Sequence, residues 1–402
     1  MGLGKQNPVS FVPIAILSQG ALGLPGCETR CGNMSVPYPF GIGPDRRYLP
    51  GFKLTCVDHG RSKPRRLLLG DGGPFEVVDI FVENNTMRVV SHGVHAINMS
   101  GSHDGGYGRW SLGDLVGGAP VPYVPIPYWN EFILTGCNVQ ATLVRNGTGG
   151  FIVSGCASFC TAIDEWSNTP FRDDGMCSNI GCCQATIPLG WASYGVELKR
   201  LNDSQPKGTV SVLIAEKGWF NKNLTTSIYP GHPRLVTPEL KAKLTVPVIL
   251  NWAAAHGTAA NRSQPPYALD PCPDDAARSI CKSSNSRCED AGYYTLIAST
   301  PYYRCSCNHG YEGNPYLTGG CQDIKECNRK EGHACFGDCE ELPGSFRCRC
   351  PEGTRGDFRR PGGCVAVKST NTTSAIASTG KDVEAKVLQS KPWTAVEAVG
   401  VS

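Results

Sequence analysis

The chain has 402 residues, enough for roughly two to four domains of ordinary size. Hydrophobic residues make up 40% and charged residues 18%, which is typical of a globular protein, and a formal net charge of +3 argues against a nucleic-acid-binding function. The 21 cysteines argue against a cytosolic enzyme and predict an oxidised, secreted protein. No run of about eighteen apolar residues occurs, so the sequence predicts no membrane-spanning helix.

The first 23 residues have an irregular signal-peptide pattern. Lys5 precedes an apolar stretch at 9–17, but Pro13 interrupts that stretch before the small residues at 21–23, so the mature chain is expected to begin near Leu24. Eight N-x-Ser/Thr acceptor motifs also favour secretion and predict a glycoprotein. The acceptor residues are Asn33, Asn84, Asn98, Asn146, Asn202, Asn223, Asn261 and Asn371.

Short β-branched segments bounded by Gly, Asn and Pro follow. Two of them, 75–82 and 87–90, predict a β-hairpin, since the polar residues Asn84, Asn85 and Thr86 lie between them. Further strands are predicted at 132–134, 151–153, 210–215 and 244–250, a Pro-rich loop at 117–127 and a linker at 261–266. No long helical periodicity occurs before residue 270. The predicted fold class is therefore mainly β and disulfide-rich.

The cysteines form two groups, with nine between Cys27 and Cys183 and twelve between Cys272 and Cys364. The second group consists of two six-cysteine repeats, each with a C-x-C at its fourth and fifth cysteines and thirteen residues before its last one. Each repeat resembles an EGF-like module, and zinc sites would favour C-x2-C pairs instead. Six cysteines allow fifteen pairings, from which the resemblance selects three per module. The implied pairs are Cys272–Cys288, Cys281–Cys305, Cys307–Cys321, Cys327–Cys339, Cys335–Cys348 and Cys350–Cys364.

The segment 323–327 resembles the opening of calcium-binding EGF modules. Calcium prefers carboxylate and carbonyl oxygens, and the resemblance implies ligands from Asp323, Ile324, Glu326 and Glu341. Lys325 departs from that pattern because it replaces an acid or amide, and Glu341 departs because such modules usually have Asn there. The alternative is an ordinary hinge between modules with solvated carboxylates. If calcium binds, we expect it to stiffen the joint between the two modules.

The opening segment 26–43 closely resembles the galacturonan-binding domain of plant wall-associated receptor kinases. Matching segments follow in the same order up to residue 364, including 130–137, 155–160, 177–188, 217–220 and 246–252. The resemblance implies an ectodomain, since the kinase motifs are not found here and no transmembrane segment is predicted. Nine N-terminal cysteines cannot all pair with one another. Cys137 is the candidate for the one left over, either as a buried free thiol or as a link between molecules.

Galacturonan is a polyanion, so a binder needs spaced cations, and Arg suits bidentate pairing with carboxylates. Residues 45–70 contain seven basic residues but only Asp45 and Asp58 as acids. The candidate binding residues are Arg46, Arg47, Lys53, Arg61, Lys63, Arg65 and Arg66. The alternative reading is a solvated loop. Aromatic residues could also stack on sugar rings, although such residues more often fill cores; the candidates are Tyr38, Tyr48, Trp110, Tyr123, Tyr128 and Trp129.

The sequence thus predicts a non-catalytic protein of the plant cell wall that binds pectic polysaccharide. The alternative is a protein- or peptide-recognition ectodomain that acts through the EGF-like pair. No common catalytic motif is found, although carboxylates distant in sequence could still converge for glycoside cleavage. The predicted segments are the signal peptide (1–23), a galacturonan-binding domain (24–105), a second β-rich region (106–262), EGF-like modules (272–321 and 323–364) and a disordered tail (365–402).

Overall fold

The computed structural model describes residues 28–43, 48–58, 60, 64–92, 105–112, 122–136, 138–145, 150–159, 177, 179, 181–201, 210–220, 245–257, 272–291, 301–329 and 335–367. The chain divides into two compact units, residues 1–328 with 341–346 and residues 329–340 with 347–402. The predicted signal peptide, the linker at 261–266 and the tail beyond residue 367 lie outside the described residues. No helix in the described ranges is long and apolar enough to cross a membrane.

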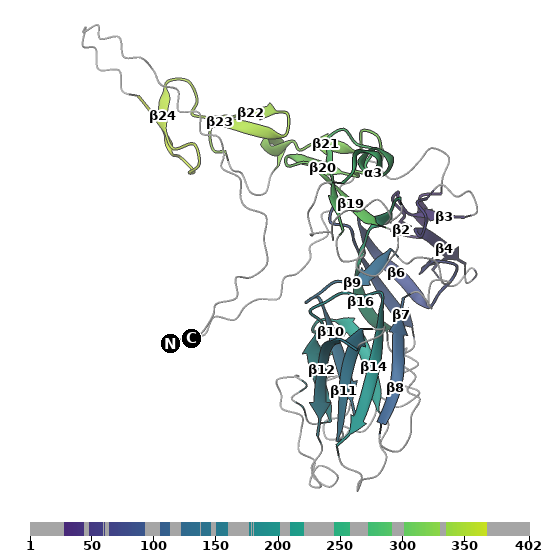
Figure 1. Ribbon diagram of the computed structural model, residues 1–402. Coiled ribbons are helices and arrows are strands. Elements are labelled where there is room, and N and C mark those ends of the chain that lie inside the picture. The colour runs from purple at the N-terminus through teal and green to yellow at the C-terminus, as the bar shows by residue number, and fades with distance from the viewer. Residues whose placement is uncertain are drawn as a thin grey trace, which may run out of the picture. The chain divides into compact units, whose positions relative to one another are not determined.

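A seven-stranded sheet lies in the middle of the first unit (Figure 1). Its spatial order is β3 (Gly41–Ile42), β4 (Lys53–Val57), β5 (Arg66–Leu69), β6 (Phe75–Phe81), β7 (Thr86–His92), β16 (Thr245–Trp252) and β9 (Tyr123–Pro125). The predicted hairpin is confirmed, since β6 and β7 pair in antiparallel register. However, β9 and β16 come from the predicted second region. The boundary between 24–105 and 106–262 therefore does not separate two independent units.

Two further sheets belong to the first unit. One has the order β13 (Cys182–Thr186), β10 (Asn130–Thr135) and β15 (Ser211–Glu216). The other has the order β12 (Ile152–Ser158), β11 (Val139–Arg145), β14 (Ser193–Arg200) and β8 (Gly105–Ser111). The first five residues of β10 and of β15 are all buried, which agrees with the consecutive apolar residues at 132–134 and 212–215. The four further strands predicted from the sequence correspond to β10, β12, β15 and β16.

The predicted loop at 117–127 is wrong in part, because Tyr123–Pro125 forms β9. Proline cannot donate a ladder hydrogen bond and is found on edge strands. β9 lies at the edge of the seven-stranded sheet and pairs only with β16 among the described strands. The edge position therefore explains how a proline-rich sequence can form a strand. β9 is followed by the turn that precedes β10.

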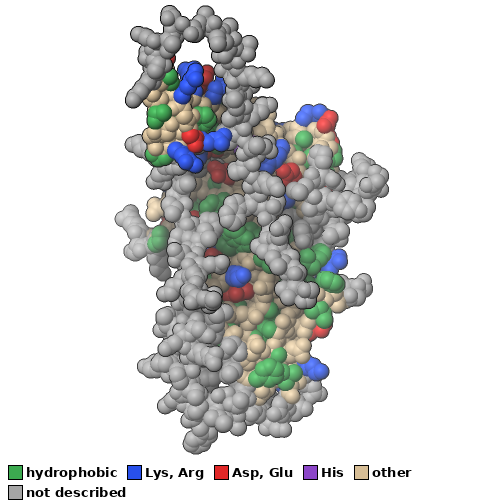
Figure 2. Space-filling view, turned by 90° about the vertical axis from the view of Figure 1, so that its left-hand side faces the viewer, with side chains coloured by type: hydrophobic (Ala, Val, Ile, Leu, Met, Phe, Trp, Pro, Cys, Tyr) green, Lys and Arg blue, Asp and Glu red, His purple; other side chains and the backbone are tan. Residues whose placement is uncertain are grey.

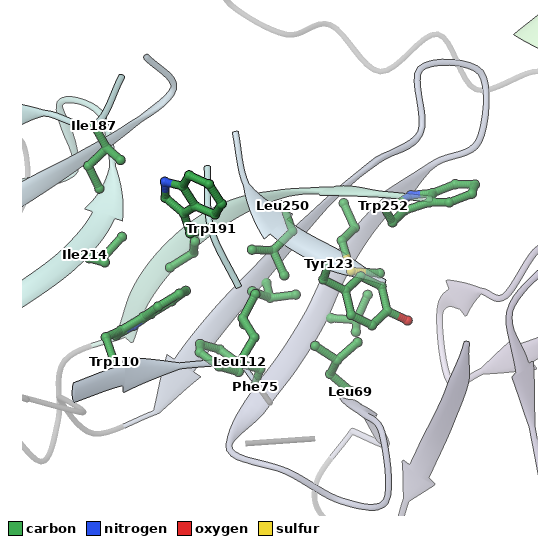
Figure 3. Packing of buried hydrophobic residues seen from close by; sticks show 14 of the residues in the cluster. Leu69, Phe75, Trp110, Leu112, Tyr123, Ile187, Trp191, Ile214, Leu250 and Trp252 are labelled. Atoms are coloured by element: carbon green, nitrogen blue, oxygen red, sulfur yellow. The ribbon is translucent and has the colours of Figure 1, made fainter. Parts of the chain in front are cut away.

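The largest hydrophobic core lies over this sheet. Figure 3 shows Leu250 between the aromatic rings of Trp110 and Trp191 on one side and of Tyr123 and Trp252 on the other. The Trp252 ring packs edge-on against Phe40 and Phe52, with ring centroids 5.2 and 5.4 Å apart. Burying such rings is among the largest single contributions to folding available to a β domain.

The first EGF-like module is part of the same unit. Its elements are β17 (Ala254–Ala255), α3 (Asp274–Ile280), β18 (Ser286–Asp290), β19 (Tyr302–Cys307), β20 (Tyr311–Gly313), β21 (Cys321–Asp323) and the 3-10 helix η2 (Glu326–Asn328). β17 directly follows β16 and pairs with β19. The wholly buried Tyr316 packs against Trp252, and its hydroxyl donates to Asn85 Oδ1 and accepts from the Cys305 N–H. The module therefore shares a core with the N-terminal sheet.

The second unit holds the rest of the chain. β22 (Asp338–Leu342) begins within it and β23 (Ser345–Arg349) ends within it. β24 (Thr354–Gly356) pairs with β25 (Cys364–Ala366). β25 includes the first two residues of the predicted tail, so the tail prediction starts too early. At the other end of the chain, β1 (Arg30–Cys31) and β2 (Met34–Ser35) form a two-stranded ribbon.

Disulfides connect these small elements. The structure pairs Cys31–Cys56, Cys156–Cys183, Cys177–Cys182, Cys272–Cys288, Cys281–Cys305, Cys307–Cys321, Cys335–Cys348 and Cys350–Cys364. The last five are pairs that the EGF-like resemblance implies, and Cys327 and Cys339 are also disulfide-bonded. Cys137, predicted to be the residue without a partner, lies outside the described residues together with Cys27 and Cys160.

Candidate functional site

Three of the seven candidate galacturonan-binding cations lie among the described residues, on or beside β4 and β5. Lys53 begins β4, Arg66 begins β5, and Arg65 precedes Arg66. Along β5 Leu67 and Leu69 are buried, so the alternation of a strand directs Arg66 to the outer face. The other four, Arg46, Arg47, Arg61 and Lys63, lie in segments outside the described residues.

Each of the three described cations pairs with a carboxylate of the chain. Lys53 hydrogen-bonds Asp71, and this bond raises the pKa of Lys53. Arg65 lies 3.3 Å from Asp58 and 3.8 Å from Glu28. These pairs are largely exposed, and exposed pairs contribute little to stability.

The Arg66 pair is less exposed, with its Nε 2.7 Å from Glu76 Oε2. On the face drawn in Figure 2, many Lys and Arg side chains of the described residues similarly lie beside Asp or Glu. The sequence count of seven basic against two acidic residues in 45–70 therefore overstates the local positive charge. It omits Glu28, Asp71 and Glu76, which lie outside that window in sequence but beside it in space.

The predicted calcium ligands lie together at the end of β21. Asp323 accepts the Gly344 N–H at 2.6 Å and the Lys325 ammonium at 2.7 Å, and these two bonds lower the pKa of Asp323. Glu341 Oε1 accepts the Cys327 N–H at 2.8 Å. Burial, followed by the negative charges of Glu341 and Asp323, raises the pKa of Glu326.

Two buried carboxylate oxygens at this joint, Glu326 Oε2 and Glu341 Oε2, have no hydrogen-bond partner. Buried oxygens of this kind are normally paired, so the donor set fits a hard cation such as calcium. The geometry is not that of a preformed cage, since the described residues contain no group of three His, Cys, Asp or Glu close enough to hold a metal. Lys325 instead supplies the positive charge next to Asp323.

The backbone holds this joint closely. The Ile324 N–H donates to the Gly310 carbonyl at 2.9 Å. A side chain at Gly310, whose φ is +78°, would lie only 2.0 Å from the Gly344 carbonyl oxygen. Only glycine permits this approach, which brings residues 341–346 onto the first module.

The six aromatic candidates divide by exposure. Tyr123 and Trp110 are buried, and Tyr38 and Tyr48 pack partly buried against the core. Tyr128 and Trp129 are 62% and 48% exposed. The sequence could not separate the two groups, because exposure depends on which strands pair in the folded chain and not on local composition.

Two of the eight predicted glycosylation acceptors are described. Asn33 and Asn84 both lie in exposed turns, and the Thr86 hydroxyl of the second motif donates to Asn84 Oδ1 at 2.6 Å. The other six acceptors lie outside the described residues. Both described sites are therefore accessible to solvent, as an acceptor must be.

Comparison with known proteins places these features in a family context. Residues 27–91 match the family model described as wall-associated receptor kinase galacturonan-binding. The chain is 30% identical over 337 residues to wall-associated receptor kinase 4 of Arabidopsis thaliana, an alignment that covers 80% of this chain and 38% of that protein. It is 29% identical over 330 residues to wall-associated receptor kinase 2 of the same plant, covering 80% of this chain and 37% of that protein.

A third relative, wall-associated receptor kinase-like 6 of Arabidopsis thaliana, is 28% identical and aligns with 79% of this chain and 47% of its own length. The chain thus spans less than half the length of these relatives. No solved structure matches it. The predicted resemblance to the wall-associated receptor kinases is confirmed by the family match and by these three relatives.

Proposed function

We propose that this chain, an ectodomain of the wall-associated receptor kinase type, binds galacturonan in the plant cell wall and catalyses no reaction. The observation that carries the proposal is the galacturonan-binding family match at 27–91, the same part of the chain that holds β4 and β5 and their exposed cations. The disulfides and accessible glycosylation motifs support an extracellular location.

Binding would proceed by exchange of carboxylates. Asp71 and Asp58 hold Lys53 and Arg65 in exposed, weak pairs, so a galacturonate carboxylate can replace either acid at little cost. The Arg66–Glu76 pair is less exposed and would hold its cation in place. The four cations at 46–47 and 61–63, which are close to these residues in sequence, would add to the positive charge of this domain.

Substitution of the basic segment tests this mechanism. We expect Lys53→Gln with Arg65→Gln to weaken binding of the whole chain to de-esterified polygalacturonate about tenfold at low salt. The wild-type affinity should fall as sodium chloride rises, because exposed charges are screened beyond about 10 Å at 0.1 M. Retention of full affinity by the double variant, or binding insensitive to salt, would contradict the proposal.

We further propose that calcium binds at the joint formed by Asp323, Glu326 and Glu341, with the Ile324 carbonyl. The two unpaired buried oxygens support it. Calcium would supply a positive charge shared by the three carboxylates and stiffen the joint. Because Lys325 already contacts Asp323, its ammonium must leave that carboxylate when the ion binds.

A further inference from the structure

The turn between β9 and β10 presents two large aromatic side chains to solvent. Tyr128 and Trp129 are 62% and 48% exposed, and both lie outside the family match at 27–91. The labels β9 and β10 in Figure 1 mark the strands on either side of this turn. Leaving two aromatic rings in water forgoes the stabilisation that their burial would give.

The backbone of this turn is strained. Tyr128 has a φ of +63°, in the left-handed region that bulky side chains rarely adopt. Such conformations persist only where the surroundings enforce them, and they are concentrated at functional sites. The sequence offers no reason for a tyrosine here on folding grounds, since glycine or asparagine would fit the same backbone with less strain.

Three neighbouring segments hold the turn in place. The Tyr128 N–H donates to the Ile187 carbonyl, and the Trp129 carbonyl accepts the Lys217 N–H, both at 2.9 Å. The wholly buried Asn130 donates to the Ile249 carbonyl at 2.8 Å and accepts the Ile249 N–H at 2.9 Å. The two aromatic residues are therefore presented on a preorganised turn, which lowers the entropic cost of binding.

The charges beside the turn favour an anionic ligand. Lys217 is exposed and forms no ion pair with the residues that the structure describes, unlike Lys53, Arg65 and Arg66. Two acids adjoin it, Glu131, which interacts electrostatically with Lys217, and Glu216, and both have other partners. Glu131 Oε1 accepts from the Gln184 amide at 3.0 Å and the Gly218 N–H at 3.1 Å. Glu216 lies 2.7 Å from the Arg88 guanidinium.

We propose that Tyr128, Trp129 and Lys217 form a second contact site for an acidic wall polysaccharide, which binds one uronic acid unit. The apolar face of the pyranose ring would pack on the aromatic rings, and its carboxylate would pair with the Lys217 ammonium. This inference rests on the proposed function, because it assigns galacturonan a second contact outside residues 27–91. A polymer long enough to reach both sites would gain affinity from their linkage.

Substitutions in the full chain test the site. Tyr128→Asn removes the ring but suits the left-handed backbone, so loss of binding would not reflect misfolding. We expect Tyr128→Asn, Trp129→Ala and Lys217→Gln each to weaken binding of de-esterified oligogalacturonide about tenfold. Trp129→Phe, which keeps a stacking face, should retain binding within about threefold of wild type.

Matched controls are available elsewhere on the surface. Tyr107, which is 49% exposed on β8, and the exposed Lys199 on β14 give Tyr107→Asn and Lys199→Gln, which should bind like wild type. Unchanged binding by Tyr128→Asn and Trp129→Ala would overturn the second site while leaving the proposed function intact. A wild-type chain that does not bind the oligomer at all would overturn both, so the two failures are distinguishable.

Discussion

The cations Lys53 and Arg65 illustrate how a pattern of charge differs from a charged surface. Both lie where the sequence predicts a basic patch, yet each contacts an acid that is close in space. Lys53 and Asp71 meet because β4 and β5 pair and Asp71 follows β5. If the chain binds a polyanion as proposed, these acids would compete with it for the two cations.

Removing such a competitor should strengthen binding. We expect Asp71→Asn to raise the affinity for de-esterified galacturonan about two- to threefold at low salt, because Lys53 gains a free ammonium and a repulsive charge is lost. Glu289→Gln is the matched control, since it releases Arg287 from an ion pair on the first EGF-like module. An equal gain in both variants, measured by calorimetric titration, would indicate a general effect of net charge and contradict a local competitor.

The buried tyrosine Tyr316 tests the connection between the first module and the N-terminal sheet. Its burial raises the pKa of its hydroxyl, and that hydroxyl bonds both Asn85 and the Cys305 N–H. Tyr316→Phe would leave a buried acceptor and donor unpaired, so we expect about 1–3 kcal/mol of lost stability in denaturant unfolding. Tyr128→Phe removes an exposed hydroxyl and should cost less than about 0.5 kcal/mol. Equal stability of Tyr316→Phe and wild type would show that the network does not stabilise the fold.

At the scale of elements, prediction succeeds where local pattern decides. The hairpin of β6 and β7 was readable because β-branched residues flank a polar turn. β15 is also predictable, because its residues 212–215 are consecutive apolar residues. β9 is not predictable in this way, because Pro125 and the prolines on either side of the strand argue against a central strand, and nothing local indicates the edge to which it pairs. The exposure of Tyr128 and the partners of Lys53 also depend on long-range pairing, so no local signal could have identified them.

The joint after β21 supports a prediction about how Glu326 affects stability, both without and with calcium. An acid whose pKa is raised on folding destabilises the folded state as the pH rises from its unfolded pKa to its folded pKa, and the penalty is complete above the folded pKa. Without calcium, Glu326→Gln should therefore melt at a higher temperature than wild type at pH 7, and the difference should shrink as the pH falls through the Glu326 pKa. With about 10 mM calcium, wild type should gain about 1.4–2.7 kcal/mol and the variant should gain none.

Glu352→Gln provides the control for this experiment, since Glu352 is an exposed acid outside the joint. It should leave both the calcium-free melting temperature and the calcium response unchanged. A Glu326→Gln chain that responds to calcium like wild type would show that this carboxylate is not a ligand.

At the scale of the whole molecule, the first EGF-like module, predicted as the separate segment 272–321, packs into the core of the N-terminal sheet. Tyr316 and Cys305 complete the environment of Trp252 and Asn85, and β19 pairs with β17 directly after β16. A fragment of residues 24–268 would expose these surfaces. We expect it to aggregate or to lack the near-ultraviolet circular dichroism of a packed core, whereas residues 24–367, which keep every disulfide of both modules, should fold. A cooperative melt of the shorter fragment would contradict the shared core.

The central claim, recognition of an acidic pectic polymer, is tested most directly by calorimetric titration of the whole chain with oligogalacturonides. De-esterified and fully methyl-esterified oligomers of equal length would be compared in a chelator, so that calcium cannot cross-link the ligand. The account predicts saturable binding of the de-esterified oligomer that weakens with salt, and at least about tenfold weaker binding of the ester. Equal affinity for both oligomers, or binding of neither by a chain shown to be folded, would contradict it.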